Sequence, residues 1–346
     1  MCIRDRDERP ADAAVRAFTP PVPDVFRLEN GLGVWRIHRP DVPLVAARLV
    51  VPAGSSTDTL ATSGRALFTA SMLREGAGGM DALAFAEALD GLGATFYTEV
   101  DRDLAIAGMQ VLHRHLDEAF GLFASAVRDP LFDEGGWSRV RGRLATAIDT
   151  LVDEPEHLAL RVARTAFFGD RGVRYALPVR GTRAGIVGLS VDAVRAFHAE
   201  RYRPEGSVLL LAGDLSVEEA RALAERHLGD WTGRVRTPGA AGKAASGGTT
   251  RVLLVDRPGA EQTVLLLVLP GVAWGDARRL PLTVANEALG GSFTSRLNAR
   301  LREREGTTYG CYSWLQPYRH DGLLEASAAV QTEKTGQALR SLLEEA

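Results

Sequence analysis

The sequence has little cysteine, no long apolar segment and no excess of charge of one sign. Its 346 residues include two cysteines, Cys2 and Cys311, which cannot form a disulfide framework. No apolar run approaches the roughly 20 residues that a membrane-spanning helix needs. The 41 basic and 44 acidic residues give a net charge of −3, which provides no overall basic field to hold nucleic acid. These absences favour an ordinary globular chain, as does the hydrophobic content of 45%.

The first residues show no secretory signal. Residues 1–16 are charged and mixed and lack an apolar segment, and the opening MCIRDR is unlike the start of a domain. We therefore treat residues 1–23 as an uncertain lead-in. The compartment stays open between a bacterial periplasm and a cytoplasm.

Strand and helix patterns alternate along the chain and predict an α+β fold. Apolar or alternating runs bounded by turn residues predict strands over 44–51, 104–111, 207–212, 252–255, 263–269 and 323–330. Helical spacing predicts helices over 60–74, 80–92, 116–127, 134–151, 156–168, 191–200, 216–228, 281–289, 293–304 and 333–346. Ser190 is expected to cap one of these helices, and Ser216 with Glu219 has the spacing of a capping box.

A linker divides the chain into two similar parts. Residues 237–250, TPGAAGKAASGGTT, are small and flexible and separate an expected domain at 24–236 from one at 251–346. The segment GATFY at 93–97 and the segment GTTYG at 306–310 each follow a helix and precede a strand and another helix. This repetition favours an internal duplication, of which the second copy is expected to be incomplete. Chance similarity between two α+β domains is the alternative.

The usual sequence motifs of enzymes do not occur. None of the seven histidines pairs with another four residues away beside a glutamate, and there is no nucleophile elbow or phosphate-binding glycine loop. His113 and His115 alternate at an expected strand end, and we interpret them as a surface pair. Gly290 and Gly291 are interpreted as a helix end and turn.

Six motifs in a fixed order nevertheless resemble the insulinase family, which includes pitrilysin-like and mitochondrial-processing peptidases. They are FRLENGL at 26–32, the glycine-bounded helix at 64–76, RGT at 180–182 with Leu-Ser at 189–190, YRP at 202–204, LAGDL at 211–215, and SRL, LRE and a tyrosine at 295–309. The resemblance begins near residue 24 and implies two homologous α/β-sandwich domains. In each, an antiparallel-rich sheet packs with helices, and together they form one half of a clamshell.

The resemblance also locates a zinc site that this chain has lost. The family motif is His-x-x-Glu-His on a helix with a distal glutamate, in which two imidazoles and a carboxylate bind zinc. The matching histidine positions are Leu67 and Ser71, the catalytic base position is Ala70, and the distal glutamate position is Ala147. These side chains are expected to pack the helices. We predict no metal in this chain and zinc in a partner subunit.

An arginine and a tyrosine of the second part match a pair that the family directs at the zinc site. By resemblance, Tyr309 donates a hydrogen bond to the scissile carbonyl or its oxyanion, and Arg302 holds the substrate backbone. The alternative for Arg302, inside the charged run 300–305, is a solvated surface residue. The alternative for Tyr309 is a core aromatic residue.

The resemblance thus implies a catalytically silent subunit of a heterodimeric zinc endopeptidase. Its partner would be a paralogous chain with an intact zinc motif, and peptides would be the substrates. A non-enzymatic scaffold subunit of a larger complex is the alternative. No nucleic-acid partner and no membrane span are expected.

Overall fold

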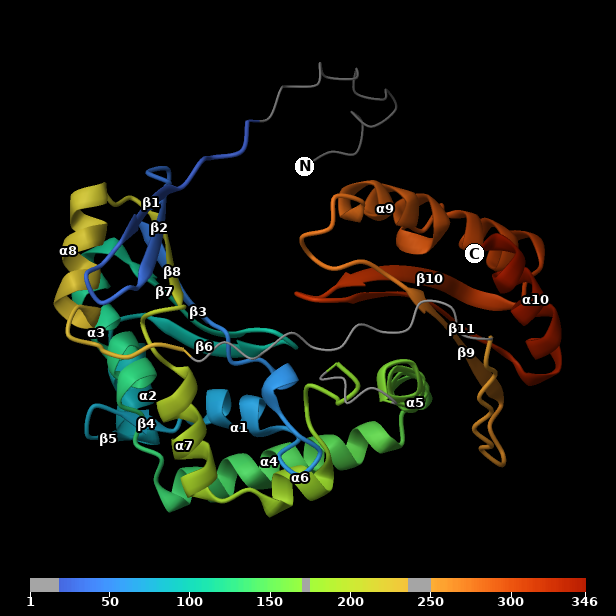
Figure 1. The fold of residues 1–346 in the computed structure, drawn as a ribbon, viewed down its shortest axis with the longest axis horizontal. Helices are drawn as coiled ribbons and strands as arrows, with labels where there is room; N and C mark the ends of the chain where they lie inside the picture. Colours follow the sequence, from blue (N-terminus) through green and yellow to red (C-terminus); the bar gives the residue numbers. More distant parts are fainter. Residues whose placement is uncertain (1–18, 170–174, 236–249) are drawn as a thin grey trace, which may run out of the picture.

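The described residues form two large sheets, each packed with helices, that lie side by side (Figure 1), and a small two-stranded sheet, β4-β5. The structure is a computed structural model that describes residues 19–169, 175–235 and 250–346. The predicted linker, apart from its last residue, lies outside the described residues, as does most of the lead-in. Within the described residues, none of the helices has the length and apolar character needed to cross a membrane.

The first sheet has six strands in the order β1-β2-β8-β3-β7-β6. Its strands are β1 (Asp24–Arg27), β2 (Gly33–His38), β3 (Leu44–Val51), β6 (Thr95–Val100), β7 (Ala105–Leu112) and β8 (Val208–Gly213). The pair β2 and β8 is parallel and the other pairs are antiparallel. Alternate residues of β3, from Val45 to Val51, are fully buried, so one face of the sheet carries the core.

Helices cover that face and extend beyond it. They are α1 (Arg65–Met72), α2 (Ala82–Gly91), α3 (Leu116–Arg128), α4 (Glu134–Val152), α5 (Pro155–Phe168), α6 (Arg183–Gly188), α7 (Val191–Arg201) and α8 (Val217–Leu228). Shorter elements are η2 (Ser55–Thr57), η3 (His113–His115), β4 (Gly76–Ala77) and β5 (Met80–Asp81). Phe85, Phe120 and Phe123 fill the core between the helices and the sheet. The helix α1 lies between this sheet and the helices α4 and α7.

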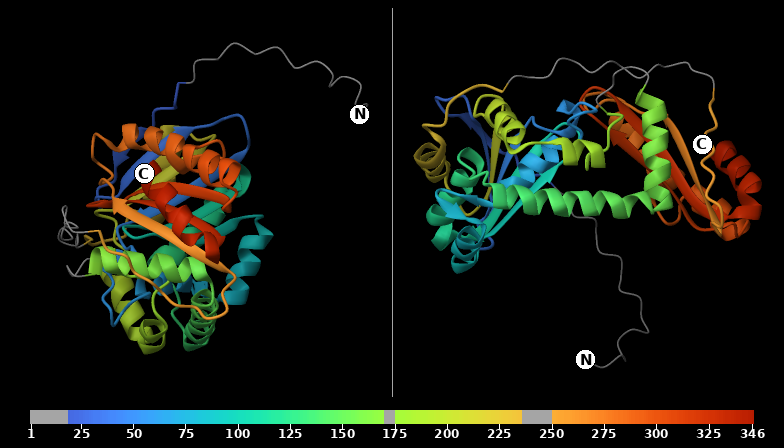
Figure 2. Two further views of the ribbon diagram at one scale, coloured as in Figure 1. Left: turned by 90° about the vertical axis from the view of Figure 1, so that its right-hand side faces the viewer. Right: turned by 90° about the horizontal axis from the view of Figure 1, so that it is seen from below.

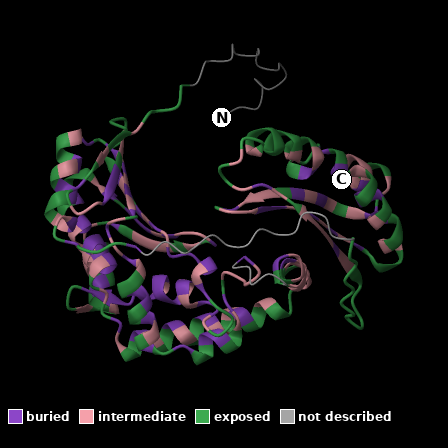
Figure 3. Ribbon diagram, in the orientation of Figure 1, coloured by how far each residue is buried: buried purple, intermediate pink, exposed green. Residues whose placement is uncertain are grey.

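The second sheet has three antiparallel strands in the order β10-β11-β9. Its strands are β9 (Gln262–Pro270), β10 (Thr308–Pro317) and β11 (Gly322–Gln331). Its helices are α9 (Arg279–Asn286), the π-helices η5 (Glu287–Gly291) and η6 (Asn298–Arg304), η7 (Thr332–Lys334) and α10 (Thr335–Glu345). Figure 3 shows α9 as largely exposed, and none of its residues is buried.

The two sheets share one arrangement. The order β6-β7-β3 in the first sheet corresponds to β10-β11-β9 in the second. In both, a hairpin is followed by a short 3-10 helix and then a long helix. The hairpin β6-β7 is followed by η3 and α3, and the hairpin β10-β11 is followed by η7 and α10. The predicted fold class of two homologous α/β units is therefore confirmed.

The two units meet where α5 packs against β9. Figure 2 shows α5 turning away from α4 at a sharp corner and running along the second sheet. Arg164 of α5 forms a buried ion pair with Glu325 of β11, with Nε and Oε1 2.7 Å apart. The rings of Tyr175 and Tyr318 stack with their centroids 4.7 Å apart across the same junction. The junction is thus built from paired charges and stacked aromatic rings.

One local prediction was wrong. Residues 252–255 do not form a strand; their side chains are exposed, Val252 by 80% and Leu254 by 89%, so no neighbouring strand or core pairs with them. His113 and His115 directly follow the end of β7, in the short helix η3, and neither is buried. Gly290 and Gly291 are the last two residues of the π-helix η5, and Gly290 fits against the backbone of Ser313.

Candidate functional site

The helix α1, which carries three of the four candidate zinc positions, is fixed firmly at its amino end. The buried carboxylate of Asp58 accepts hydrogen bonds from the backbone N–H groups of Gly64 at 3.0 Å and Ala66 at 3.3 Å. Burial raises the pKa of Asp58 to about 6, against the opposing effect of the Arg65 guanidinium. Gly64 has φ +100° and faces the backbone of Gly181, so this position requires glycine.

The four candidate zinc positions bear packing side chains. Leu67 packs against an apolar cluster that includes Phe68, and Ala70 is 1% exposed. Ser71 on α1 and Ala147 on α4 are both partly buried. The four side chains offer one hydroxyl and no imidazole or carboxylate, so they do not fit a zinc ion. Across the described parts of the chain, no group of three histidine, cysteine or acidic residues could hold a metal ion.

Arg302 and Tyr309 lie at the carboxyl-terminal unit and have different surroundings. The Arg302 guanidinium lies 4.1 Å from the centre of the Phe293 ring, and its Nε is 3.4 Å from the Glu303 carboxylate. The Tyr309 side chain is 92% exposed near the start of β10. This exposure excludes the core alternative for Tyr309. The partial burial of Arg302 against Phe293 leaves its surface alternative open.

Tyr309 lies at the end of β10 that is remote from the junction between the units. The other end of β10 leads directly to Tyr318, whose ring stacks on Tyr175. Nine residues of extended chain separate Tyr309 from Tyr318, a span of about 30 Å. Tyr309 therefore points its hydroxyl outward from a part of the molecule that the first unit does not cover.

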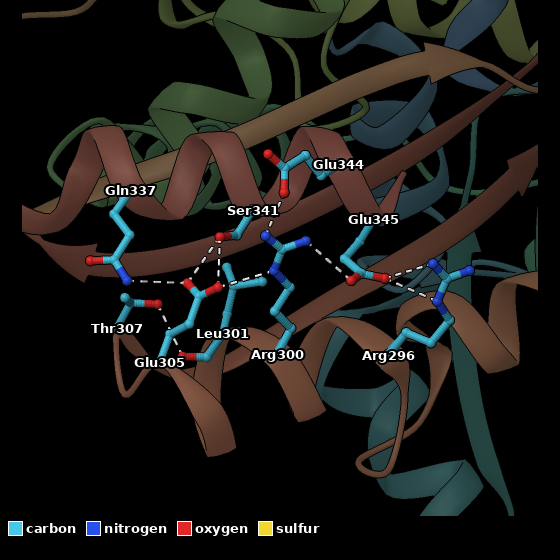
Figure 4. A network of polar contacts seen from close by, with 9 residues as sticks. All are labelled: Arg296, Arg300, Leu301, Glu305, Thr307, Gln337, Ser341, Glu344 and Glu345. Carbon is cyan, nitrogen blue, oxygen red and sulfur yellow. Dashed lines mark hydrogen bonds and ion pairs between the residues drawn. The ribbon is translucent and has the colours of Figure 1, made fainter.

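A network of ion pairs that we did not predict holds the segment between Arg302 and Tyr309 (Figure 4). Arg300 on η6 contacts Glu305 at 3.0 Å, Glu344 at 2.5 Å and Glu345 at 3.2 Å. The Glu305 carboxylate accepts a hydrogen bond from the Ser341 hydroxyl at 2.8 Å. These contacts attach the end of η6 to α10 and so fix the start of β10. The cluster of charges at 300–305 was visible in the sequence, but its partners on α10 were not.

Comparison with known proteins places these elements in one family. Residues 34–178 match the family described as insulinase (peptidase family M16), and residues 188–346 match the peptidase M16 inactive domain. The chain belongs to the insulinase family. The predicted family is thus confirmed over both parts of the chain.

Similar proteins of the insulinase family occur in several bacteria. An uncharacterized zinc protease of Mycobacterium leprae is 29% identical over 87% of this chain and 68% of its own length. Another, from Mycobacterium tuberculosis, is 29% identical over 96% of this chain and 74% of its own. The crystal structure of a peptidase M16 inactive domain from Pseudomonas fluorescens superposes with a TM-score of 0.87 at 28% identity, covering 93% of this chain and 78% of that one. A protease from Helicobacter pylori, 17% identical, shares the fold with a TM-score of 0.84 over 94% of this chain and 80% of that one.

Proposed function

We propose that this insulinase-family chain is a catalytically silent subunit of a heterodimeric zinc endopeptidase. In this proposal a paralogous partner holds the zinc ion in an intact His-x-x-Glu-His motif. This chain supplies Tyr309 and Arg302 to the partner's site, where they bind the peptide and the oxyanion that forms during hydrolysis. Membership of the insulinase family does not by itself identify a partner chain, the roles of Tyr309 and Arg302, or the subunit that holds the zinc ion.

The observation that carries the proposal is the contrast between the two candidate sites. The positions on α1 and α4 bear side chains that pack and cannot bind zinc, as Leu67 and Ala70 do. Tyr309, by contrast, is 92% exposed. A large aromatic residue held in the open by an ordered ion-pair network is well suited to a partner's site, because its hydroxyl is free to donate.

Zinc content and peptide cleavage test the proposal directly. The purified chain alone should contain no stoichiometric zinc and should not cleave fluorogenic peptides. Mixing it with a zinc-motif paralogue from the same genome should produce cleavage that a chelator abolishes. Stoichiometric zinc in the isolated chain, or chelator-sensitive cleavage by it, would contradict the proposal.

The pair is tested in the mixture by substitution. Tyr309→Phe removes only the hydroxyl, and the loss of one oxyanion donor should lower kcat by about tenfold or more. Arg302→Ala should lower kcat/KM to a similar extent because the backbone of the peptide loses a forked donor. Tyr312→Phe on β10 and Arg304→Ala on η6 are the matched controls and should leave both constants within about twofold. Full activity in both test variants would exclude the assigned roles.

A non-enzymatic scaffold subunit is the second candidate function. The exposed helix α9, which buries none of its residues, favours it because such a surface suits another protein. Under this alternative the mixture would form a complex without cleavage. Tyr309→Phe would then leave assembly, measured by analytical ultracentrifugation, unchanged.

A further inference from the structure

A cavity of about 200 Å³ lies in the corner between α4 and α5, and none of the candidate zinc positions is among its described lining residues. Figure 2 shows the two helices meeting there. Its apolar lining comes from Ile148 and Leu151 on α4, Leu158 on α5, and Pro178 and Val179 on the segment that follows Tyr175. The cavity therefore offers an apolar interior at the junction of the two units.

Among the residues that the structure describes, all ionisable side chains that line the cavity are basic. They are Arg102, His157, Arg161, Arg164 and Arg180, and none of the described lining residues is an aspartate or a glutamate. The exposed residues Arg161 and Arg180 lie at its margin, whereas Arg102 is 9% exposed and Arg164 is 7% exposed. An apolar cavity with convergent guanidinium groups is typical of a binding site for an organic anion.

Of the two buried guanidinium groups, that of Arg164 is paired with a buried carboxylate. Glu325 accepts hydrogen bonds from Arg164 Nε at 2.7 Å and Arg164 Nη2 at 2.9 Å, so both of its oxygens are engaged. Arg102 donates its Nε–H to the Tyr175 carbonyl at 3.4 Å and lies over the Tyr318 ring. Within the described residues, the terminal nitrogens of Arg102 have no hydrogen-bond partner.

The nearby acidic residues do not complete the pairing of Arg102. Asp103 accepts hydrogen bonds from the Tyr175 hydroxyl at 2.8 Å and the Arg319 backbone N–H at 2.7 Å. Asp101 is exposed and accepts from the backbone of its own turn. Burial lowers the pKa of Arg102, and the neighbouring charge of Arg164 acts in the same direction. The terminal nitrogens of Arg102 are thus available to an anion that enters the cavity.

We propose that this cavity binds a carboxylate that carries an apolar chain of about six to eight carbons. The carboxylate would pair with Arg102 and Arg180, and the chain would lie against Ile148 and Leu158. The size is appropriate, because an apolar cavity of about 150 Å³ accepts a benzene ring. A medium-chain fatty acid and the carboxyl end of a peptide with an apolar last residue share this chemistry. The proposal does not depend on the proposed function.

Thermal unfolding with matched ligands tests the proposal. Octanoate should raise the Tm of the full chain by about 3 °C or more at a hundredfold excess over its Kd, since a ligand that binds only the folded state stabilises it. Octylamine and 1-octanol have the same chain without the carboxylate and should not raise the Tm. The dipeptide N-acetyl-Ala-Leu, which has a free carboxylate, should also raise the Tm. The same dipeptide with an amidated carboxyl end should not. Equal effects of octanoate and octanol, or no effect of either carboxylate, would overturn the proposal.

Two arginine substitutions, one at the cavity and one at the start of α6, locate the effect. Arg180→Gln should weaken octanoate binding by about tenfold in calorimetry, the usual loss for one charged hydrogen bond. Arg183→Gln is the matched control, because Arg183 is exposed, pairs with Asp149 and does not line the cavity. Equal Kd values in the two variants would exclude this site. If N-acetyl-Ala-Leu binds more tightly than octanoate, the result supports the proposal with the carboxyl end of a peptide as the ligand. If octanoate binds more tightly, the result supports the proposal with a fatty acid as the ligand.

Discussion

His198 on α7 is a buried histidine that the fold keeps neutral. Burial lowers its pKa to about 4, and its Nε2 lies 2.8 Å from the Val127 carbonyl. Its ring stacks on Tyr202 with the centroids 4.8 Å apart, which leaves no room for water to hydrate a charge. A contact to a carbonyl requires that Nε2 carries the proton in the neutral ring.

This histidine should make stability depend on pH. The unfolded chain protonates His198 near pH 6.5, whereas the folded chain keeps it neutral down to about pH 4. Its contribution is therefore complete above pH 6.5 and is lost as the pH falls toward 4, by up to about 3 kcal/mol. Urea unfolding between pH 4.5 and 7 should show this slope in the wild type. His198→Gln should reduce the slope, and the exposed His38→Gln should not; an unchanged slope in His198→Gln would contradict the assignment.

At the scale of single elements, α8 depends on a capping box. The Ser216 hydroxyl accepts a hydrogen bond from the Glu219 N–H at 3.1 Å, and the Glu219 carboxylate accepts one from the Ser216 N–H at 2.7 Å. Ser216→Ala should lower the free energy of unfolding by about 1 kcal/mol, because the Glu219 N–H loses its hydroxyl partner. Ser216→Asp retains an acceptor and should restore most of the loss. Chemical denaturation of both variants provides the measurement, and equal stability of Ser216→Ala and wild type would refute it.

Elements with local signals were predictable from the sequence. The helix α8 has its capping box, α7 has Ser190 as its cap, and β3 has an apolar run that ends at a Pro-Ala-Gly turn. The strand β10 was not predicted, because Gly310, Ser313 and Gln316 interrupt its apolar pattern. Its existence depends on pairing with β11 and on contacts to η5 and η6, which no local spacing reveals.

In the candidate site, too, residue types could be read from the sequence, whereas contacts between distant segments could not. The assignment of Leu67 and Ala147 as candidate zinc positions came from the sequence alone, by resemblance, and it stays a prediction. The basic cavity was not predictable, because Arg102 and Arg180 are brought together only by the folded chain. Arg164 and Glu325 lie 161 positions apart and meet only when α5 packs on the second sheet.

At the scale of the whole molecule, the ion pair between Arg164 and Glu325 connects the two units. Glu325 is 2% exposed, and it also accepts a hydrogen bond from the Gln316 side-chain amide. Removal of one member of a buried pair leaves the other charged without compensation, which costs about 3–5 kcal/mol. Glu325→Leu should therefore destabilise the chain strongly, and more than the exposed-pair variant Asp149→Leu.

The double variant separates the ion pair from the packing of the junction. Arg164→Met combined with Glu325→Leu removes both charges and keeps most of the volume, so it should recover most of the stability lost in Glu325→Leu. Urea unfolding followed by both tryptophan fluorescence and circular dichroism is the measurement. Coincident transitions in the double variant would show that the stacked rings of Tyr175 and Tyr318 still couple the units. If Glu325→Leu unfolds in two separate steps, the buried ion pair is the contact that makes the two units unfold together. If Glu325→Leu is as stable as the wild type, this ion pair does not hold the junction.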